Sequence, residues 1–247
     1  MTARVDEIAE DVFRISTHRP DGLPGGLVYN QFLIRAGQPM LIHTGMPVLF
    51  PGVADAIRSL IAIGTLRWIA GSHASRPDEF GALAQFEAVA PNAQVAAGKI
   101  AVGVCLRHMT EREPRALATG VVLDLGDRAV RFFATPHVPF WEAGMWWDER
   151  TGTLLCGDLF TAEGDGPALT GRDIVGPAVA FEARMRHLTL SRYLAPTLRS
   201  MAGLNPRVLA LMHGPAFTGG GPGALRELAA HYDRVLPLPN TGVQVIR

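Results

Sequence analysis

Short apolar, β-prone runs separated by turn residues dominate the first third of the chain. These runs predict strands over residues 12–16, 27–35 and 40–45. Gly37-Gln38 supplies the turn between the last two, as in a hairpin. Apolar residues then recur at helical spacing over residues 53–61, just after Pro51, a residue favoured at helix starts. The pattern therefore predicts an antiparallel, hairpin-rich beginning followed by a helix.

The rest of the chain repeats this alternation of strands and helices. Buried apolar runs predict strands over residues 66–70, 121–135, 144–160 and 208–212, the second and third of these being strand pairs. Helical spacing predicts helices over residues 78–88, 177–201 and 223–236. Strand-rich and helix-containing segments thus alternate twice, which indicates two sheets enclosed by outer helices. We expect a single domain over residues 1–247.

Composition and charge exclude several classes of function. The chain is 48% hydrophobic and 19% charged, which is enough apolar material for a buried core. Lys plus Arg equals Asp plus Glu, 23 each, so no global field attracts nucleic acid or an anionic membrane. The basic cluster is interpreted as a solvated helix face; it comprises Arg184, Arg186, His187 and Arg192. We therefore expect neither nucleic acid nor membrane as a partner.

The chain carries none of the usual signs of export or membrane insertion. No apolar stretch reaches the roughly 18 residues of a spanning helix. Cys105 and Cys156 lie in apolar surroundings in a chain without a signal peptide. That usage fits a reducing compartment, and a cytoplasmic location is expected.

Polar residues that suit metal ions stand where predicted strands end or helices begin. His73, His137, Asp158 and His213 follow apolar runs, and Asp78-Glu79 opens a helix. The fold would gather such residues at one rim of the sheets. A mixture of imidazole and carboxylate without thiolate favours iron, manganese or zinc. Because a carboxylate has two oxygens, Asp158 can bridge two ions, and the pattern predicts a two-metal site.

In their order and spacing these motifs resemble the metallo-β-lactamase fold, within it the di-iron, oxygen-binding branch related to flavodiiron proteins. The likeness runs from Val28-Tyr29-Asn30-Gln31-Phe32-Leu33 to Leu211-Met212-His213-Gly214. It implies an α/β, αββα four-layer sandwich. It also implies a metal ligand set, position by position: His73, Asp78, Glu79 in place of a second motif His, His137, Asp158 as the bridge, and His213.

Two departures from the family pattern affect the metals. Ser75 stands where the family has Glu, which leaves the first ion His73, His137 and Asp158. Glu79 is interpreted either as an oxygen ligand of the second ion or as an acidic residue at a helix start. If Arg76 points inward, it could form an ion pair with Glu79 instead and cancel the ligand role. The oxygen-rich set shifts the preference toward iron, with zinc or manganese as alternatives.

Residues around the expected centre receive supporting roles. His43 is expected either to hydrogen-bond the His73 loop or to act as a cap, without touching metal. Phe140 and Trp141 either line the pocket or pack in the core. The remaining histidines fit no ligand pattern, so surface or helix positions are expected for His18, His108, His187 and His231.

Three functions follow from this reading. The first is a non-haem di-iron protein that binds or reduces O2 or NO, binds no flavin itself and takes electrons from a separate donor. The second is a metal-dependent hydrolase in which Asp78 orients a metal-activated water toward an ester, thioester, lactone or phosphodiester. The third is a sensor with a partly filled site. The substrate would be a diatomic or another small molecule, and a homodimer is compatible with the Trp-rich hairpin.

Overall fold

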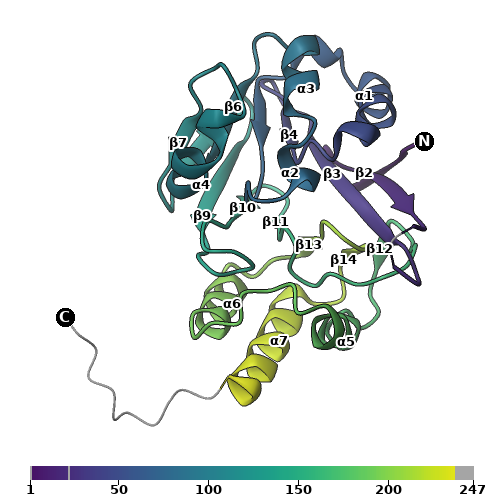
Figure 1. The fold of residues 1–247 in the computed structure, drawn as a ribbon, viewed down its shortest axis with the longest axis vertical. Helices are drawn as coiled ribbons and strands as arrows, with labels where there is room; N and C mark the ends of the chain where they lie inside the picture. Colours follow the sequence, from purple (N-terminus) through teal and green to yellow (C-terminus); the bar gives the residue numbers. More distant parts are fainter. Residues whose placement is uncertain (1, 22, 237–247) are drawn as a thin grey trace, which may run out of the picture.

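The chain folds into two seven-stranded sheets packed face to face, with helices on both outer faces (Figure 1). The computed structural model describes residues 2–21 and 23–236. One sheet has the strand order β1-β2-β3-β4-β5-β6-β7 and the other β12-β14-β13-β11-β10-β9-β8. The αββα sandwich predicted from the sequence is therefore confirmed.

The first half of the chain builds the first sheet and its helical cover. Its strands are β1 Arg4–Ala9, β2 Val12–Arg19, β3 Leu27–Ile34, β4 Met40–Ile42, β5 Trp68–Ala70, β6 Gln94–Gly98 and β7 Arg115–Leu117. Its helices are α1 Phe50–Arg58, α2 Pro77–Phe80, α3 Leu83–Val89 and α4 Lys99–Val104, with short 3-10 turns at Pro47–Leu49, Ile63–Thr65 and Leu106–His108. Strands β1 to β4 are antiparallel, and β4 to β7 are parallel.

The second half builds the second sheet in the same manner. Its strands are β8 Val122–Asp124, β9 Ala129–Ala134, β10 Gly144–Asp148, β11 Thr153–Leu155, β12 Leu169–Thr170, β13 Val208–Ala210 and β14 Ala216–Phe217. Its helices are α5 Val175–Met185, α6 Leu194–Gly203 and α7 Gly221–Val235. Within the described ranges, no helix is long and apolar enough to cross a membrane.

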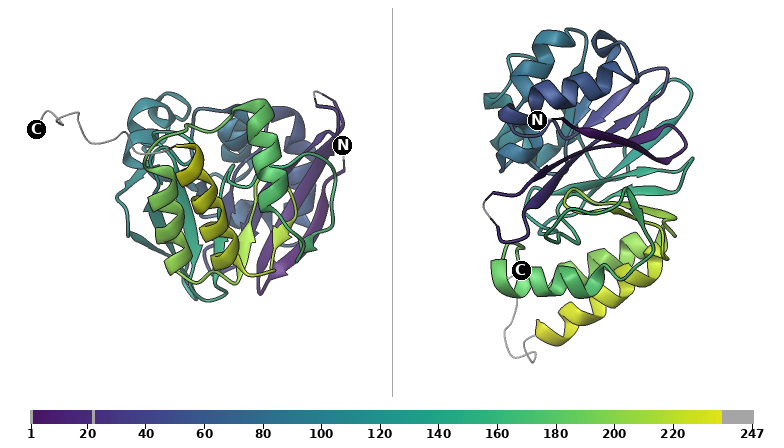
Figure 2. Two further views of the ribbon diagram at one scale, coloured as in Figure 1. Left: turned by 90° about the horizontal axis from the view of Figure 1, so that it is seen from below. Right: turned by 90° about the vertical axis from the view of Figure 1, so that its right-hand side faces the viewer.

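Three apolar layers hold the sandwich together, one between each pair of adjacent layers. The layer between the first sheet and its helices contains Leu41 of β4 and Phe86 of α3. The second sheet buries Leu209 against α5 to α7. The layer between the sheets contains Phe32 and Trp146. Figure 2 shows the helices of the first half and those of the second half on opposite outer faces.

Two predicted helices are each interrupted in the structure. The helix expected over residues 78–88 breaks into α2 and α3, because Ala82 N–H donates to the Gly45 carbonyl (2.9 Å) instead of continuing the helix. The helix expected over residues 177–201 divides into α5 and α6. Arg186 takes a left-handed conformation (φ 48°) directly after α5. The basic cluster around residues 184–192 is therefore not one helix face.

Candidate metal centre

The candidate centre lies where strands of both sheets end. His73 follows β5 of the first sheet, whereas Asp158 follows β11 and His213 follows β13 of the second. Asp78 and Glu79 lie in the short helix α2. Strands β11 and β13 run parallel, so their carboxyl ends meet at one edge. His73 is thereby brought together with Asp158, 85 positions later in the chain, and with His213, 140 positions later. The strand-end pattern predicts this convergence.

The imidazoles and carboxylates form two groups that share Asp158. In one group, His73 Nε2 lies 3.0 Å from Glu79 Oε1 and 3.3 Å from Asp158 Oδ2. In the other, His213 Nε2 lies 3.4 Å from Asp78 Oδ2 and 3.3 Å from Asp158 Oδ1. All five side chains are buried. Each oxygen of Asp158 therefore faces a different imidazole.

Asp158 is brought this close to the first sheet by the glycine that precedes it. Gly157 has a φ of +56°, a left-handed value that L side chains adopt at a cost. A Cβ at this position would lie 2.3 Å from Ser72 Oγ. Only glycine permits both the turn and this close approach to the loop that carries His73.

Glu79 binds the backbone of the His73 loop. Its Oε2 accepts hydrogen bonds from the backbone N–H groups of Ser72 (2.6 Å) and His73 (2.8 Å), and Oε1 accepts one from Ser72 Oγ. His43 lies beside both residues, with its Nε2 3.4 Å from Ser72 Oγ and 3.6 Å from Glu79 Oε2. Glu79 thus orients His73 in addition to facing its imidazole, and His43 touches the same loop.

Arg76 points toward the centre, but it lies against Asp158 and not against Glu79, the ion-pair partner that the sequence suggests. Its Nη1 lies 3.6 Å from Asp158 Oδ2 instead of pairing with Glu79. The guanidinium also stacks over the ring of Phe140 at 4.7 Å, and that ring meets His73 edge-on at 4.7 Å. Phe140 therefore forms a wall of the centre and holds Arg76 beside it.

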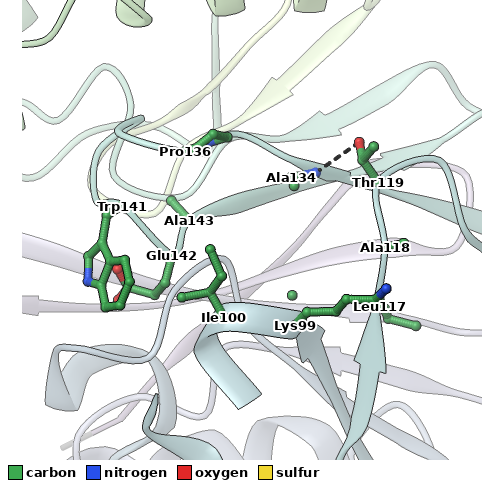
Figure 3. A pocket seen from close by; sticks show the side chains of 11 residues that line it. Lys99, Ile100, Leu117, Ala118, Thr119, Ala134, Pro136, Trp141, Glu142 and Ala143 are labelled. Atoms are coloured by element: carbon green, nitrogen blue, oxygen red, sulfur yellow. Dashed lines mark hydrogen bonds between the residues drawn. The ribbon is translucent and has the colours of Figure 1, made fainter. Parts of the chain in front are cut away.

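Three residues expected at or near the centre lie outside the two groups of donors. His137 belongs to neither group of donors; its ring stacks on Tyr193, and its buried Nδ1 has no hydrogen-bond partner. Ser75 is exposed, and its hydroxyl donates to Glu142. Trp141 is 52% exposed and lines a separate, mainly apolar cavity of about 300 Å³ beside α4 and β7 (Figure 3).

Three residues that the sequence reasoning did not assign to the site do contact it. Asn30 Nδ2 donates to the carbonyls of Leu211 and Gly214, both at 2.7 Å, and so holds the His213 loop. Tyr29 meets the His213 ring edge-on at 5.1 Å. His187 lines a cavity together with Asp78 and His213. The available signal was the polar pair Asn30-Gln31 within a mainly apolar strand.

Burial and charge shift the pKa values of the central groups in opposite directions. Burial alone lowers the pKa of His73, but the Glu79 charge and the Asp158 carboxylate outweigh it and raise the pKa to about 9. For His213, burial is likewise outweighed by Asp158 and Asp78, which raise the pKa to about 10. Burial raises the pKa of Asp158, yet the two imidazoles hold it well below its ordinary value. Without metal, the centre therefore holds two imidazolium groups at neutral pH.

The donor set fits two cations. Oxygen and imidazole nitrogen converge from five buried side chains, with one carboxylate common to both groups. The Asp78 Oδ1 atom is buried without a hydrogen-bond partner, and Asp158 Oδ1 faces only the His213 imidazole, at 3.3 Å. An orphaned carboxylate oxygen is costly unless a cation or a donor satisfies it.

The raised pKa values predict that the metal-free protein loses stability as the pH rises. Both folded values exceed the ordinary 6.5, so this contribution is complete below about pH 6.5 and is lost as the pH passes through 9 to 10. Urea unfolding of chelator-treated protein at pH 7 and pH 10.5 should differ by about 2 kcal/mol or more. A His108→Gln variant, altered at an exposed histidine, should show the same loss, whereas His213→Asn should show less. An equal loss in His213→Asn would contradict the assignment.

Comparison with known proteins agrees with this architecture. A flavo-diiron protein, FprA2 of Clostridium acetobutylicum, is 30% identical over 49% of this chain and 30% of its own length. The type A flavoprotein fprA of Rhodobacter capsulatus is 27% identical over 77% of this chain and 45% of its own length. The chain thus spans less than half the length of these relatives.

The same architecture occurs in solved structures. Rubredoxin oxygen:oxidoreductase from the anaerobe Desulfovibrio gigas superposes with a TM-score of 0.82 at 16% identity, over 93% of this chain and 62% of that one. At this identity the likeness establishes the fold. The sequence model of the ODP family beta lactamase matches residues 27–214, which include both groups of donors. The chain therefore belongs to the family described as ODP family beta lactamase.

Proposed function

We propose that this chain is a two-metal redox domain, with iron as the preferred metal, that binds or reduces O2 or NO. The observation that carries the proposal is the pair of donor groups joined by Asp158. Two cations held on one carboxylate are a common arrangement for two-metal chemistry. The family membership and the flavo-diiron relative support iron.

The proposed ligands follow the geometry. His73, Glu79 and Asp158 would hold one ion, and Asp78, Asp158 and His213 the other. The sequence pattern placed His137 in the first set, but it lies outside both groups, so the proposed set omits it. Three of the five side chains supply oxygen, which favours iron over zinc.

The bound ions would supply the electrons for reducing a diatomic molecule. The chain's own residues position and shield them. Glu79 fixes the His73 loop, and Phe140 covers the first position with an apolar ring. Arg76 places a permanent positive charge beside Asp158. We propose that electrons reach the centre from a donor outside the described residues, because the strands of the described residues all belong to the two sheets of the one sandwich.

The test is the metal content and redox behaviour of protein made in iron-supplemented cells. We expect about two irons per chain. We also expect a near-ultraviolet band that bleaches on anaerobic reduction and returns when O2 or NO is added. Protein purified from zinc-supplemented cells serves as the control and should show neither the band nor O2 uptake. Protein from iron-supplemented cells that carries no iron would contradict the proposal.

Metal-dependent hydrolysis is a second candidate, favoured by one observation. A cavity of about 360 Å³ opens beside Asp78 and His213, and a diatomic molecule fills only a small part of it, since a water molecule takes roughly 30 Å³. The zinc-loaded protein would then turn over a p-nitrophenyl ester, and Asp78→Asn would lose that activity. Absence of turnover by the zinc-loaded protein would exclude this candidate for simple esters.

A further inference from the structure

The cavity beside Asp78 and His213 has the size of a small-molecule site. Its volume of about 360 Å³ lies in the range of ligand pockets. Strand β3 contributes Leu27 and Tyr29 to its lining, and helix α5 with the turn after it contributes Phe181, Met185 and Arg186. The lining therefore combines an apolar wall with a guanidinium group.

Among the described residues, each charged side chain around this cavity lies near a group of opposite charge, except Arg186. Arg76 lies near Asp158, and Asp78 lies near His213. Of the cationic residues at the end of α5, Arg184 pairs with Glu163 and His187 lies against Glu182. Within residues 2–21 and 23–236, Arg186 has no ion-pair or side-chain hydrogen-bond partner. The Arg186 side chain is exposed to solvent, and its guanidinium is thus free to pair with an anionic ligand at the cavity.

The neighbouring residue, His187, offers a second unsatisfied polar group. Its side chain is 10% exposed, and its Nδ1 lies 2.7 Å from Glu182 Oε2. The same oxygen accepts the backbone N–H groups of His187 (3.1 Å) and Leu188 (3.2 Å), which fixes the turn. His187 Nε2 is buried without a partner. His187 Nδ1 likewise lacks a hydrogen-bond partner despite its short distance to Glu182 Oε2, so either tautomer leaves Nε2 free. A hydroxyl group can satisfy Nε2 in both tautomers, because it both donates and accepts.

The backbone of this turn is held in an uncommon conformation. Arg186 has a φ of 48°, a left-handed value that is unfavourable for an L residue other than Asn or Asp. The Glu182 contacts hold the turn in place. The result is that Arg186 and His187, adjacent in the chain, both line the cavity.

We propose that this cavity binds a small organic carboxylate that carries a hydroxyl group. The carboxylate pairs with Arg186, the hydroxyl forms a hydrogen bond with His187 Nε2, and the hydrocarbon part packs on Phe181 and Met185. A single uncompensated guanidinium matches a monoanion and forms two parallel hydrogen bonds with a carboxylate. This inference goes beyond the proposed function, because the ligand is an organic acid held beside the centre and not the diatomic molecule.

Calorimetry with four matched probes tests the proposal: hexanoate, 2-hydroxyhexanoate, 6-hydroxyhexanoate and 1-hexanol. The titrations use the protein as purified and after chelation. We expect both forms to bind hexanoate, and at least one hydroxylated acid to bind several-fold more tightly. Hexanol should bind at least tenfold more weakly than hexanoate. Arg186→Gln should weaken hexanoate binding about tenfold or more, whereas Arg184→Gln, the same charge change two residues away, should leave it unchanged.

A His187→Phe variant tests the second contact, since it should bind hexanoate normally but lose the preference for the hydroxylated acid. Equal binding by Arg186→Gln and Arg184→Gln, or no binding of any probe, would overturn the proposal. Binding of inorganic phosphate in preference to hexanoate would overturn it as well. Iron content is measured separately on the same preparations, so a failure here is distinct from a failure of the proposed redox function.

Discussion

Replacing Asp158 by Asn is expected to remove most of the metal from both positions. Each of its oxygens faces one imidazole, at 3.3 Å in both cases, so the two donor groups lose a ligand together. An amide carries no negative charge and cannot bridge two cations as a carboxylate does. Elemental analysis should show less than half of the wild-type metal per chain.

The same substitution should also affect the metal-free protein. His73 and His213 would each lose a buried anionic partner, and breaking a buried ion pair costs about 3–5 kcal/mol. The matched control is Asp165→Asn, which removes a carboxylate that pairs with Arg4 at the exposed surface. It should retain full metal content. A normally loaded Asp158→Asn protein would show that the two ions do not share this residue.

Replacing Glu79 by Ala is expected to destabilise the protein even without metal, by about 3 kcal/mol or more. The reason is that the buried Ser72 and His73 N–H groups and the Ser72 hydroxyl would all lose their acceptor. Urea unfolding of chelator-treated protein measures the effect.

Two further variants separate the roles of Glu79. Glu79→Gln keeps an acceptor oxygen and should cost less, while still reducing metal binding beside His73. Glu113→Ala, at a side chain that is 78% exposed, is the matched control and should be within about 0.5 kcal/mol of wild type. Wild-type stability of Glu79→Ala would show that the His73 loop does not depend on this carboxylate.

The sandwich and most of the centre were predictable because strand ends are local features of the sequence. His73, Asp158 and His213 each follow a short apolar strand, and parallel strands deliver their ends to one edge. The resemblance to a known family then fixed the order of the layers. The sequence pattern does not predict strands β1, β6, β7, β12 and β14. Their segments are short, and β1 alternates charged with apolar residues near the surface.

The loops around the centre were not predictable to the same degree. The path of residues 74–77 is set by partners that are distant in sequence: Ser75 bonds Glu142, and Arg76 stacks on Phe140. His187 was expected on a helix or at the surface, but α5 ends at Met185 without a glycine or proline to mark the stop. Tertiary hydrogen bonds to Glu182 fix that turn, and no local pattern encodes them.

The donors come from opposite sides of the interface between the sheets: His73, Asp78 and Glu79 from the first half of the chain, Asp158 and His213 from the second. Neither half alone contains a complete set for either ion. Metal capture can therefore occur only after both halves have folded and docked, and each ion then acts as a cross-link between them. Removing the metal with a chelator should therefore lower amide hydrogen-exchange protection at the interface between the two sheets first. The apolar layers between each sheet and its helices should lose protection only later.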